Sequence, residues 1–123
     1  MGTTKSVLVV EDQQDAREML GEWLSFCGFV VHRAGDGFEA LAIAQREHPC
    51  VILMDLMMPR MDGWEATRRL KADAGTRDSI VIAVSAHSHR DEQEKARRAG
   101  CDDFIAKPYD IERLVDLVRQ RLR

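Results

Sequence analysis

The sequence predicts an α/β protein built on an open parallel β-sheet, and two observations support this prediction. Short apolar runs, which are typical of buried strands, alternate five times with longer segments in which apolar residues recur at helical spacing. Four of the runs end directly at a charged or hydroxyl-bearing residue. In an open parallel sheet, the carboxyl ends of the strands line the crevice where ligands bind. The pattern therefore gathers polar residues from four strands at one edge of the sheet.

The first strand and helix are predicted from the apolar pattern of the N-terminal part. A strand over residues 7–10 precedes a helix over about Gln14–Phe26, and Gly28 ends this helix. The stripe of this helix that should face the core consists of Ala16, Met19, Leu20, Trp23 and Cys27. We therefore expect Trp23 to lie in the core and not in a binding surface.

The middle of the chain contains two further strands and two helices. A second strand is predicted over Phe29–Arg33, and a helix begins at Asp36-Gly37. The third strand covers 51–54, after Pro49, and stops at an acid. A third helix is predicted over about Gly63–Ala72. A polar loop follows it and leads into the next apolar run.

The last two strands are predicted over 80–84 and 104–106, and a helix follows each of them. The final helix spans about 110–122 and has a continuous apolar face. The fourth helix, over about 91–99, contains no large apolar side chain. Only Ala96, Ala99 and the Lys95 stem could cover the core there. We expect this helix to dock weakly, and weakly packed elements move at small free-energy cost.

The polar residues at the strand ends have a shared chemistry. They are Glu11, Asp12, Asp55, Ser85 and Lys107. Two carboxylates about 4 Å apart repel by roughly 4 kcal/mol at an effective dielectric constant of 20, so such a cluster favours a bound cation or a protonated acid. Oxygen ligands of this kind suit Mg²⁺. Asp55 is the lone acid on the central strand and the best candidate to accept a phosphoryl group, which an ammonium and a hydroxyl would stabilise.

One acidic residue at a strand end is usually a helix cap or a solvated loop residue. Five suitable residue types at the ends of four predicted strands are much harder to explain in that way.

Four segments carry a resemblance to a known family. They are VLVVED (7–12), VILMDLMMPRMDG (51–63), VIAVSA (81–86) and AGCDDFIAKP (99–108). In order and spacing they resemble the receiver domain of response regulators in two-component signalling, and the resemblance covers Ser6 to about Leu122. It implies a flavodoxin-like, doubly wound (βα)5 fold with strand order 2-1-3-4-5. Residues 1–123 would form one receiver domain with a core over about 6–122.

The resemblance also implies a role for each matched acid. Asp55 would be the phosphoacceptor. Asp12, Asp55 and the main-chain carbonyl of Met57 would bind Mg²⁺, or Mn²⁺ in its place. Glu11 would act through the water shell of the ion.

Three further roles follow from the same resemblance. Ser85 and Lys107 would hold the phosphoryl oxygens. Ser85 and Phe104 would change conformation with the phosphorylation state. The Lys107–Pro108 peptide bond should be cis, because the turn must direct the Lys107 ammonium back over the site, and X–Pro bonds are the ordinary place for a cis peptide.

The function implied is transfer of a phosphoryl group from a phosphohistidine, carried by a histidine kinase or a histidine phosphotransfer protein, onto Asp55. A downstream protein would bind the face formed by the fourth helix, fifth strand and fifth helix. The formation of a homodimer is a further possibility that the sequence does not decide. The protein would not be an enzyme beyond assisting its own phosphorylation and dephosphorylation.

One alternative function is that of a receiver that belongs to a hybrid histidine kinase or multidomain regulator. A remote one is a small aspartate-nucleophile phosphatase, which typically has a second Asp where Met57 stands.

Composition excludes several other classes. The 123 residues fit one domain, and 45% apolar with 32% charged residues fit a globular protein. A net charge of −3 and the lack of a recognition motif argue against direct binding to nucleic acid. No apolar run approaches 18 residues, so we expect no membrane span or signal peptide. Three cysteines without metal-ligand spacing indicate buried thiols in a cytoplasmic protein. The 15 residues after Pro108 suffice for one helix, so we expect no output domain.

Overall fold

The structure is a computed structural model, and it describes residues 5–87 and 89–122. Its strands are β1 (Ser6–Val10), β2 (Val30–Ala34), β3 (Val51–Asp55), β4 (Ile80–Ser85) and β5 (Asp103–Ala106). Its helices are α1 (Gln14–Phe26), α2 (Gly37–Glu47), α3 (Gly63–Ala72), α4 (Arg90–Ala99) and α5 (Ile111–Arg121). The strands are parallel and form one sheet in the order β2-β1-β3-β4-β5, which confirms the predicted topology.

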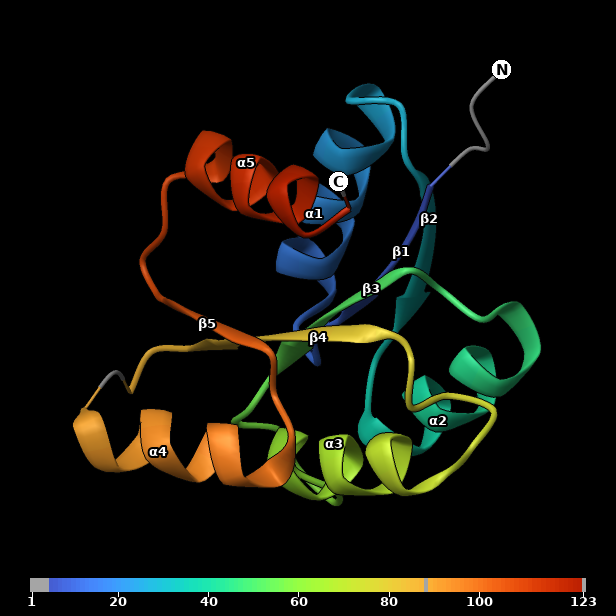
Figure 1. Ribbon diagram of the computed structural model, residues 1–123. Coiled ribbons are helices and arrows are strands. Elements are labelled where there is room, and N and C mark those ends of the chain that lie inside the picture. Colours follow the sequence, from blue (N-terminus) through green and yellow to red (C-terminus); the bar gives the residue numbers. More distant parts are fainter. Residues whose placement is uncertain (1–4, 88, 123) are drawn as a thin grey trace.

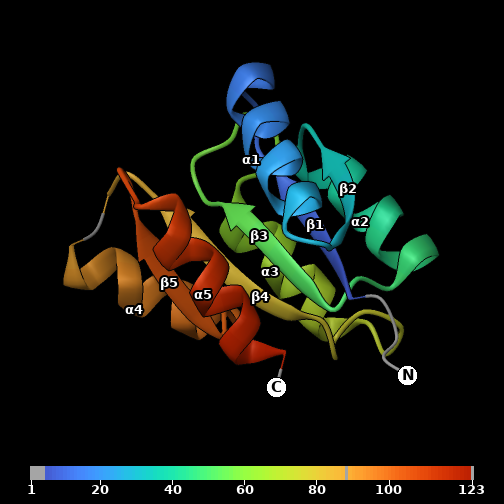
Figure 2. The same cartoon turned by 90° about the horizontal axis from the view of Figure 1, so that it is seen from above.

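The sheet separates two layers of helices (Figures 1 and 2). α1 and α5 cover one face, and α2, α3 and α4 cover the other. Side chains alternate along each strand, so Val7 and Val9 of β1 join the core under α1 and α5, while Leu8 and Val10 join the core over α2, α3 and α4. All five residues of β3 are buried, because this central strand has helices on both faces.

The boundaries agree with the sequence within one residue at almost every element. α1, α2 and α3 begin where they were predicted, and the side chains of Asp36 and Asp62 cap α2 and α3 by accepting hydrogen bonds from main-chain N–H groups. β2 lies one residue later than predicted. In the part of the chain that the structure describes, no helix has the length and apolar character needed to cross a lipid bilayer.

α1 turns a different side to the core than the sequence predicted. Leu20, Gly21 and Leu24 are buried, whereas Met19 is 63% exposed and Trp23 is 42% exposed. The prediction that Trp23 lies in the core is therefore wrong. The helix has two apolar stripes, and the one that contains Gly21 faces the sheet. A Cβ atom on Gly21 would lie 2.5 Å from Arg33 Nε, so the Arg33 side chain packs directly against the glycine.

The cysteines also depart from the prediction of buried thiols. All three are free, but only Cys101 is buried, and Cys27 and Cys50 are half-buried. Burial raises the pKa of the Cys101 thiol to about 11, so this group stays protonated.

α4 has the sparse core contacts that its sequence predicts. Only its Ala96 and Ala99 are buried. The Lys95 ammonium lies 3.9 Å from the centroid of the Trp64 ring on α3, in a cation–π contact. The expectation that α4 docks weakly stays a prediction.

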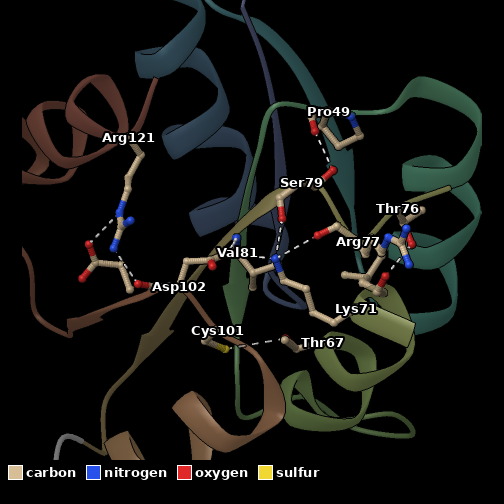
Figure 3. A network of polar contacts seen from close by, with 12 residues as sticks. Pro49, Thr67, Lys71, Thr76, Arg77, Ser79, Val81, Cys101, Asp102 and Arg121 are labelled. Carbon is tan, nitrogen blue, oxygen red and sulfur yellow. Dashed lines mark hydrogen bonds and ion pairs between the residues drawn. The ribbon is translucent and has the colours of Figure 1, made fainter. Parts of the chain in front are cut away.

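A polar network braces the amino ends of β4 and β5 (Figure 3). The Lys71 ammonium of α3 donates to the Ser79 carbonyl at 2.8 Å and to Asp102 Oδ2 at 2.9 Å. Asp102 Oδ2 also accepts from the Val81 amide at 2.8 Å. On the other side, Arg121 of α5 donates to the Asp102 carbonyl at 2.6 Å. These bonds fix the edge of the sheet that lies opposite the strand carboxyl ends.

Candidate functional site

The predicted site residues meet at the carboxyl edge of the sheet. Glu11 and Asp12 follow β1, Asp55 ends β3, and Lys107 follows β5. A hollow of about 200 Å³ there is lined by Glu11, Asp12, Gln13, Asp55, Met57, Ala86, His87 and Lys107. Ser85 ends β4 at the same edge, but it is fully buried and does not line the hollow.

The three carboxylates form a compact cluster. Glu11, Asp12 and Asp55 each offer an oxygen, and these oxygens lie within 4.8 Å of one another. Glu11 and Asp55 are buried and Asp12 is exposed, so the cluster opens toward solvent on the Asp12 side. An oxygen-only donor set with one solvent-facing side fits a hard divalent cation that keeps part of its water shell.

Lys107 supplies the positive charge of the cluster. Its Nζ atom lies 3.1 Å from Glu11 Oε1 and 3.5 Å from Asp55 Oδ2, so the ammonium is shared and lies closer to Glu11. Burial lowers the pKa of Lys107, but the two carboxylates raise it by a larger amount, so the net shift of this pKa is upward. The main-chain N–H of Lys107 donates to the Ser85 carbonyl at 2.8 Å. The Lys107–Pro108 bond is cis, as predicted.

The pKa shifts of the acids show that one ammonium does not neutralise the cluster. Burial, followed by the charge of Glu11, raises the pKa of Asp55 to about 6. Burial raises the pKa of Glu11 as well, but hydrogen bonds from the Gln13 N–H and Lys107 outweigh it and the net shift is downward. Burial and the neighbouring Glu11 raise the pKa of Asp12. The site therefore favours additional positive charge.

The loop after Asp55 is packed tightly onto the protein. Met58 and Met61 are buried and serve as packing residues, while Met57 is 50% exposed. A Cβ atom on Gly63 would lie 2.5 Å from the Asp55 carbonyl oxygen, so this glycine lets α3 start directly against the end of β3. The Met57 N–H donates to Asp55 Oδ1 at 3.1 Å and fixes that oxygen.

Ser85 and Phe104 lie on neighbouring strands and on the same face of the sheet. In the β4–β5 register, Ala83 pairs with Phe104 and Ser85 pairs with Ala106. Phe104 is half-buried and packs on the core over α2, α3 and α4. The Ser85 hydroxyl accepts a hydrogen bond from the His87 N–H at 3.1 Å.

An apolar groove adjoins the hollow, and the sequence analysis did not predict it. It has a volume of about 570 Å³ and is lined by Glu11, Gln13, Ala16, Met19, Trp23, Ala86, Lys107, Pro108, Tyr109 and Ile111. The groove shares Glu11, Gln13, Ala86 and Lys107 with the hollow. The signal in the sequence is the apolar stripe of α1 that contains Met19 and Trp23, which lines this groove and does not face the core.

Comparisons with known proteins find similarity along nearly the whole chain. The family model described as the response regulator receiver domain matches residues 7–119. The polar-differentiation response regulator DivK of Brucella ovis is 35% identical over 119 residues, which are 97% of each chain. The chemotaxis protein CheY4 of Vibrio cholerae has a TM-score of 0.91 and 26% identity, over 96% of this chain and 98% of that one. The receiver domain of a sensor histidine kinase from Pseudomonas aeruginosa PAO1, whose structure has a magnesium ion coordinated in the active site cleft, has a TM-score of 0.89 and 29% identity, over 98% of each chain.

The raised pKa of Asp55 predicts how stability depends on pH in the absence of divalent cations. The folded state holds the Asp55 proton more tightly than the unfolded state, so this group makes the wild type less stable as pH rises from about 4 to above 6. We expect Asp55→Asn to unfold at the same urea concentration as the wild type near pH 4. At pH 7.5 the variant should be more stable by roughly 1–3 kcal/mol.

Urea unfolding in EDTA at several pH values measures this difference. Saturating Mg²⁺ should reduce it, because a bound cation stabilises the wild type. A variant that is no more stable than the wild type at pH 7.5 in EDTA would contradict the electrostatic account of the cluster.

Proposed function

The chain belongs to the response regulator receiver domain family and is thus a component of two-component signalling, and from this premise we propose that Asp55 accepts a phosphoryl group from a phosphohistidine. The observation that carries the proposal is the position of the Asp55 carboxylate. It is buried at the end of the central strand, beside two further carboxylates and 3.5 Å from the Lys107 ammonium. A carboxylate so placed can act as a nucleophile only if nearby cations offset the approaching phosphoryl charge.

In the reaction, a carboxylate oxygen of Asp55 attacks phosphorus and forms an O–P bond while the N–P bond of the phosphohistidine breaks. The imidazole leaves with the electron pair and takes up a proton. Asp55 Oδ1 accepts the Met57 N–H at 3.1 Å and Oδ2 pairs with Lys107 at 3.5 Å, so Oδ2, which has the longer contact, would attack as the ammonium turns to the phosphoryl oxygens. Lys107 lies on the Oδ2 side and would pair with the transferred phosphoryl oxygens. At neutral pH most Asp55 is ionised, because its pKa is about 6.

The donor set of the cluster fits Mg²⁺, and Mn²⁺ would suit the same oxygens. Asp12, Asp55 and the Met57 carbonyl would be the direct ligands, and Glu11 would act through a bound water. When bound, the cation would supply the positive charge that the carboxylates and the phosphoryl oxygens require. Receiver domains interact with histidine kinases or phosphotransfer proteins, and such a protein would supply the phosphoryl group. The protein would assist its own phosphorylation and hydrolysis and act on no further substrate.

Phosphorylation at Asp55 is tested by intact mass after incubation with acetyl phosphate and Mg²⁺. The wild type should gain the mass of one phosphoryl group, and Asp55→Asn should gain none. Asp12→Asn should bind Mg²⁺ at least tenfold more weakly, because a direct ligand loses its charge. Asp15→Asn, an exposed acid one helical turn away, is the matched control and should behave as the wild type. Equal labelling of Asp55→Asn and the wild type would refute the proposal.

The apolar groove beside the hollow is the surface that the phosphohistidine-bearing protein would cover. The donor has to bring its imidazole to Asp55 through the open side of the hollow, and the groove begins there, at Glu11 and Lys107. Trp23 and Met19 are exposed along it, and large apolar side chains at a surface are typical of protein contacts. A helix that presents apolar residues around its phosphohistidine is the partner whose chemistry fits this surface.

Trp23→Ala should affect phosphoryl transfer from a protein donor but not from a small-molecule donor. Loss of a buried aromatic contact should slow transfer from a phosphorylated histidine phosphotransfer protein by about tenfold or more, whereas the rate with acetyl phosphate should not change. Phe38→Ala is the control, because Phe38 is 54% exposed but lies on α2, outside the groove. Equal slowing with both donors would show that Trp23 acts on the site and not on docking.

The signal would pass from Ser85 through Phe104 to the face formed by α4, β5 and α5. A phosphoryl group on Asp55 would offer the hydrogen of the Ser85 hydroxyl a charged acceptor, while in the present structure the hydroxyl oxygen accepts from the His87 N–H. Phe104 is on the same face of the neighbouring strand and could fill the space behind Ser85. Phe104 also lines two hollows, of about 430 Å³ between α4 and β5 and of about 360 Å³ between β5 and α5. A rotation of its ring would reshape this face, where a downstream protein or a second copy would bind.

Beryllofluoride, which mimics the phosphoryl group, tests this route by NMR. Chemical-shift changes should extend from Asp55 into His87–Ala99 and Asp103–Tyr109. Phe104→Ala should keep phosphorylation but lose binding to the downstream partner. Changes confined to the loops around Asp55, with α4 unaffected, would show that the signal leaves by another face.

A further inference from the structure

Arg17 reaches from α1 to the turn that carries two of the acids. Its Nη1 atom donates a hydrogen bond of 2.8 Å to the main-chain carbonyl of Glu11. That carbonyl belongs to the peptide group that joins Glu11 to Asp12. We infer that Arg17 is a positioning residue, which fixes this peptide plane and thereby the direction in which the Asp12 carboxylate points. The inference rests on the proposed function, in which Asp12 is a ligand of Mg²⁺.

The residues around the Arg17 guanidinium leave space for it beside the Glu11 main chain. A Cβ atom on Gly35 would lie 3.1 Å from Arg17 Nη1, so the glycine after β2 leaves room for the side chain. The Glu11 N–H donates to the Ala34 carbonyl at 3.1 Å. The Glu11 main chain is therefore held by β2 through its N–H and by Arg17 through its carbonyl. A helical side chain leans toward the amino end of its helix, and this is why residue 17 covers the turn at 11–13.

Asp12 needs such support more than the other two acids do. Glu11 and Asp55 are buried and both lie against Lys107, but Asp12 is exposed. The helix N-cap next to it, Gln13, makes no side-chain capping bond. The direction of the Asp12 side chain therefore depends strongly on the main chain of this turn. Glu11 Oε2 holds the turn from one side by accepting from the Gln13 N–H at 3.2 Å, and Arg17 holds the peptide group next to Asp12 from the other.

Charge and positioning predict opposite effects on cation binding, and this makes the inference testable. Removal of a positive charge near three carboxylates should by itself strengthen Mg²⁺ binding. Loss of the hydrogen bond to the Glu11 carbonyl should weaken it, because the Asp12 oxygen would spend less time in the binding geometry. A weaker affinity after removal of the guanidinium therefore identifies positioning.

The experiment is a Mg²⁺ titration of the full chain, followed by calorimetry or by NMR. Arg17→Met keeps the apolar stem and should raise the Kd by about tenfold, with Arg17→Lys in between. Arg33→Met is the matched control, because Arg33 packs against Gly21 of the same helix, and its Kd should equal that of the wild type. Amide hydrogen exchange at Asp12 and Gln13 in metal-free protein should be faster in Arg17→Met than in Arg33→Met. If Arg17→Met does not fold, Arg17→Gln carries the same expectation.

A double-mutant cycle tests whether the effect runs through Asp12. In an Asp12→Asn background, Arg17→Met should cause little further loss of Mg²⁺ affinity. An undiminished loss there, or a Kd in Arg17→Met equal to or lower than that of the wild type, would overturn the inference and leave the proposed function standing. A wild type that binds no Mg²⁺, or an Asp12→Asn variant that binds it normally, would overturn the proposed function and the inference with it.

Discussion

One ammonium group lies between two buried carboxylates, and the carboxyl edge of the sheet is arranged around it. Lys107 Nζ lies 3.1 Å from Glu11 and 3.5 Å from Asp55, so it links the ends of β1, β3 and β5. Without it, the two buried carboxylates would repel each other by several kcal/mol. The Lys107 main chain is in turn bonded to Ser85 of β4. Because Asp12 adds a third acid, the neutralisation is incomplete, and this imbalance favours a further positive charge at the site.

The fold could be predicted because local and global signals agree in most elements. β3 is an unbroken apolar run that becomes a central strand, and Asp36 and Asp62 begin α2 and α3 as capping residues do. The failure lies in α1, where apolar residues occupy two stripes and spacing alone cannot say which one faces the sheet. In the structure Leu20 and Leu24 pack into the core with residues of the strands and of α5, and only the assembled structure contains those contacts.

The candidate site was predictable to the extent that strand ends determine position. An acid at the end of a buried parallel strand must lie at the carboxyl edge of the sheet, so the positions of Asp55 and Asp12 could be predicted from the sequence. The groove could not, since it forms between Trp23 on α1 and Tyr109 after β5, two segments far apart in the chain. Arg17 was missed for a different reason. An arginine on an amphipathic helix resembles a solvated residue until the carbonyl it binds is known.

The two ends of α4 make different contacts, and this difference determines the end about which the helix would pivot. At its carboxyl end, Gly100 lies against the Lys71 stem, where a Cβ atom would approach within 2.8 Å, and Lys71 is bonded into the network around Asp102. At its amino end, next to the carboxyl edge of the sheet, neither Arg90 nor the cap residue His89 is buried. A helix of 10 residues is about 15 Å long. A tilt of about 10° around the fixed end would therefore displace the free end by roughly 2.5 Å and leave the braced strands in place.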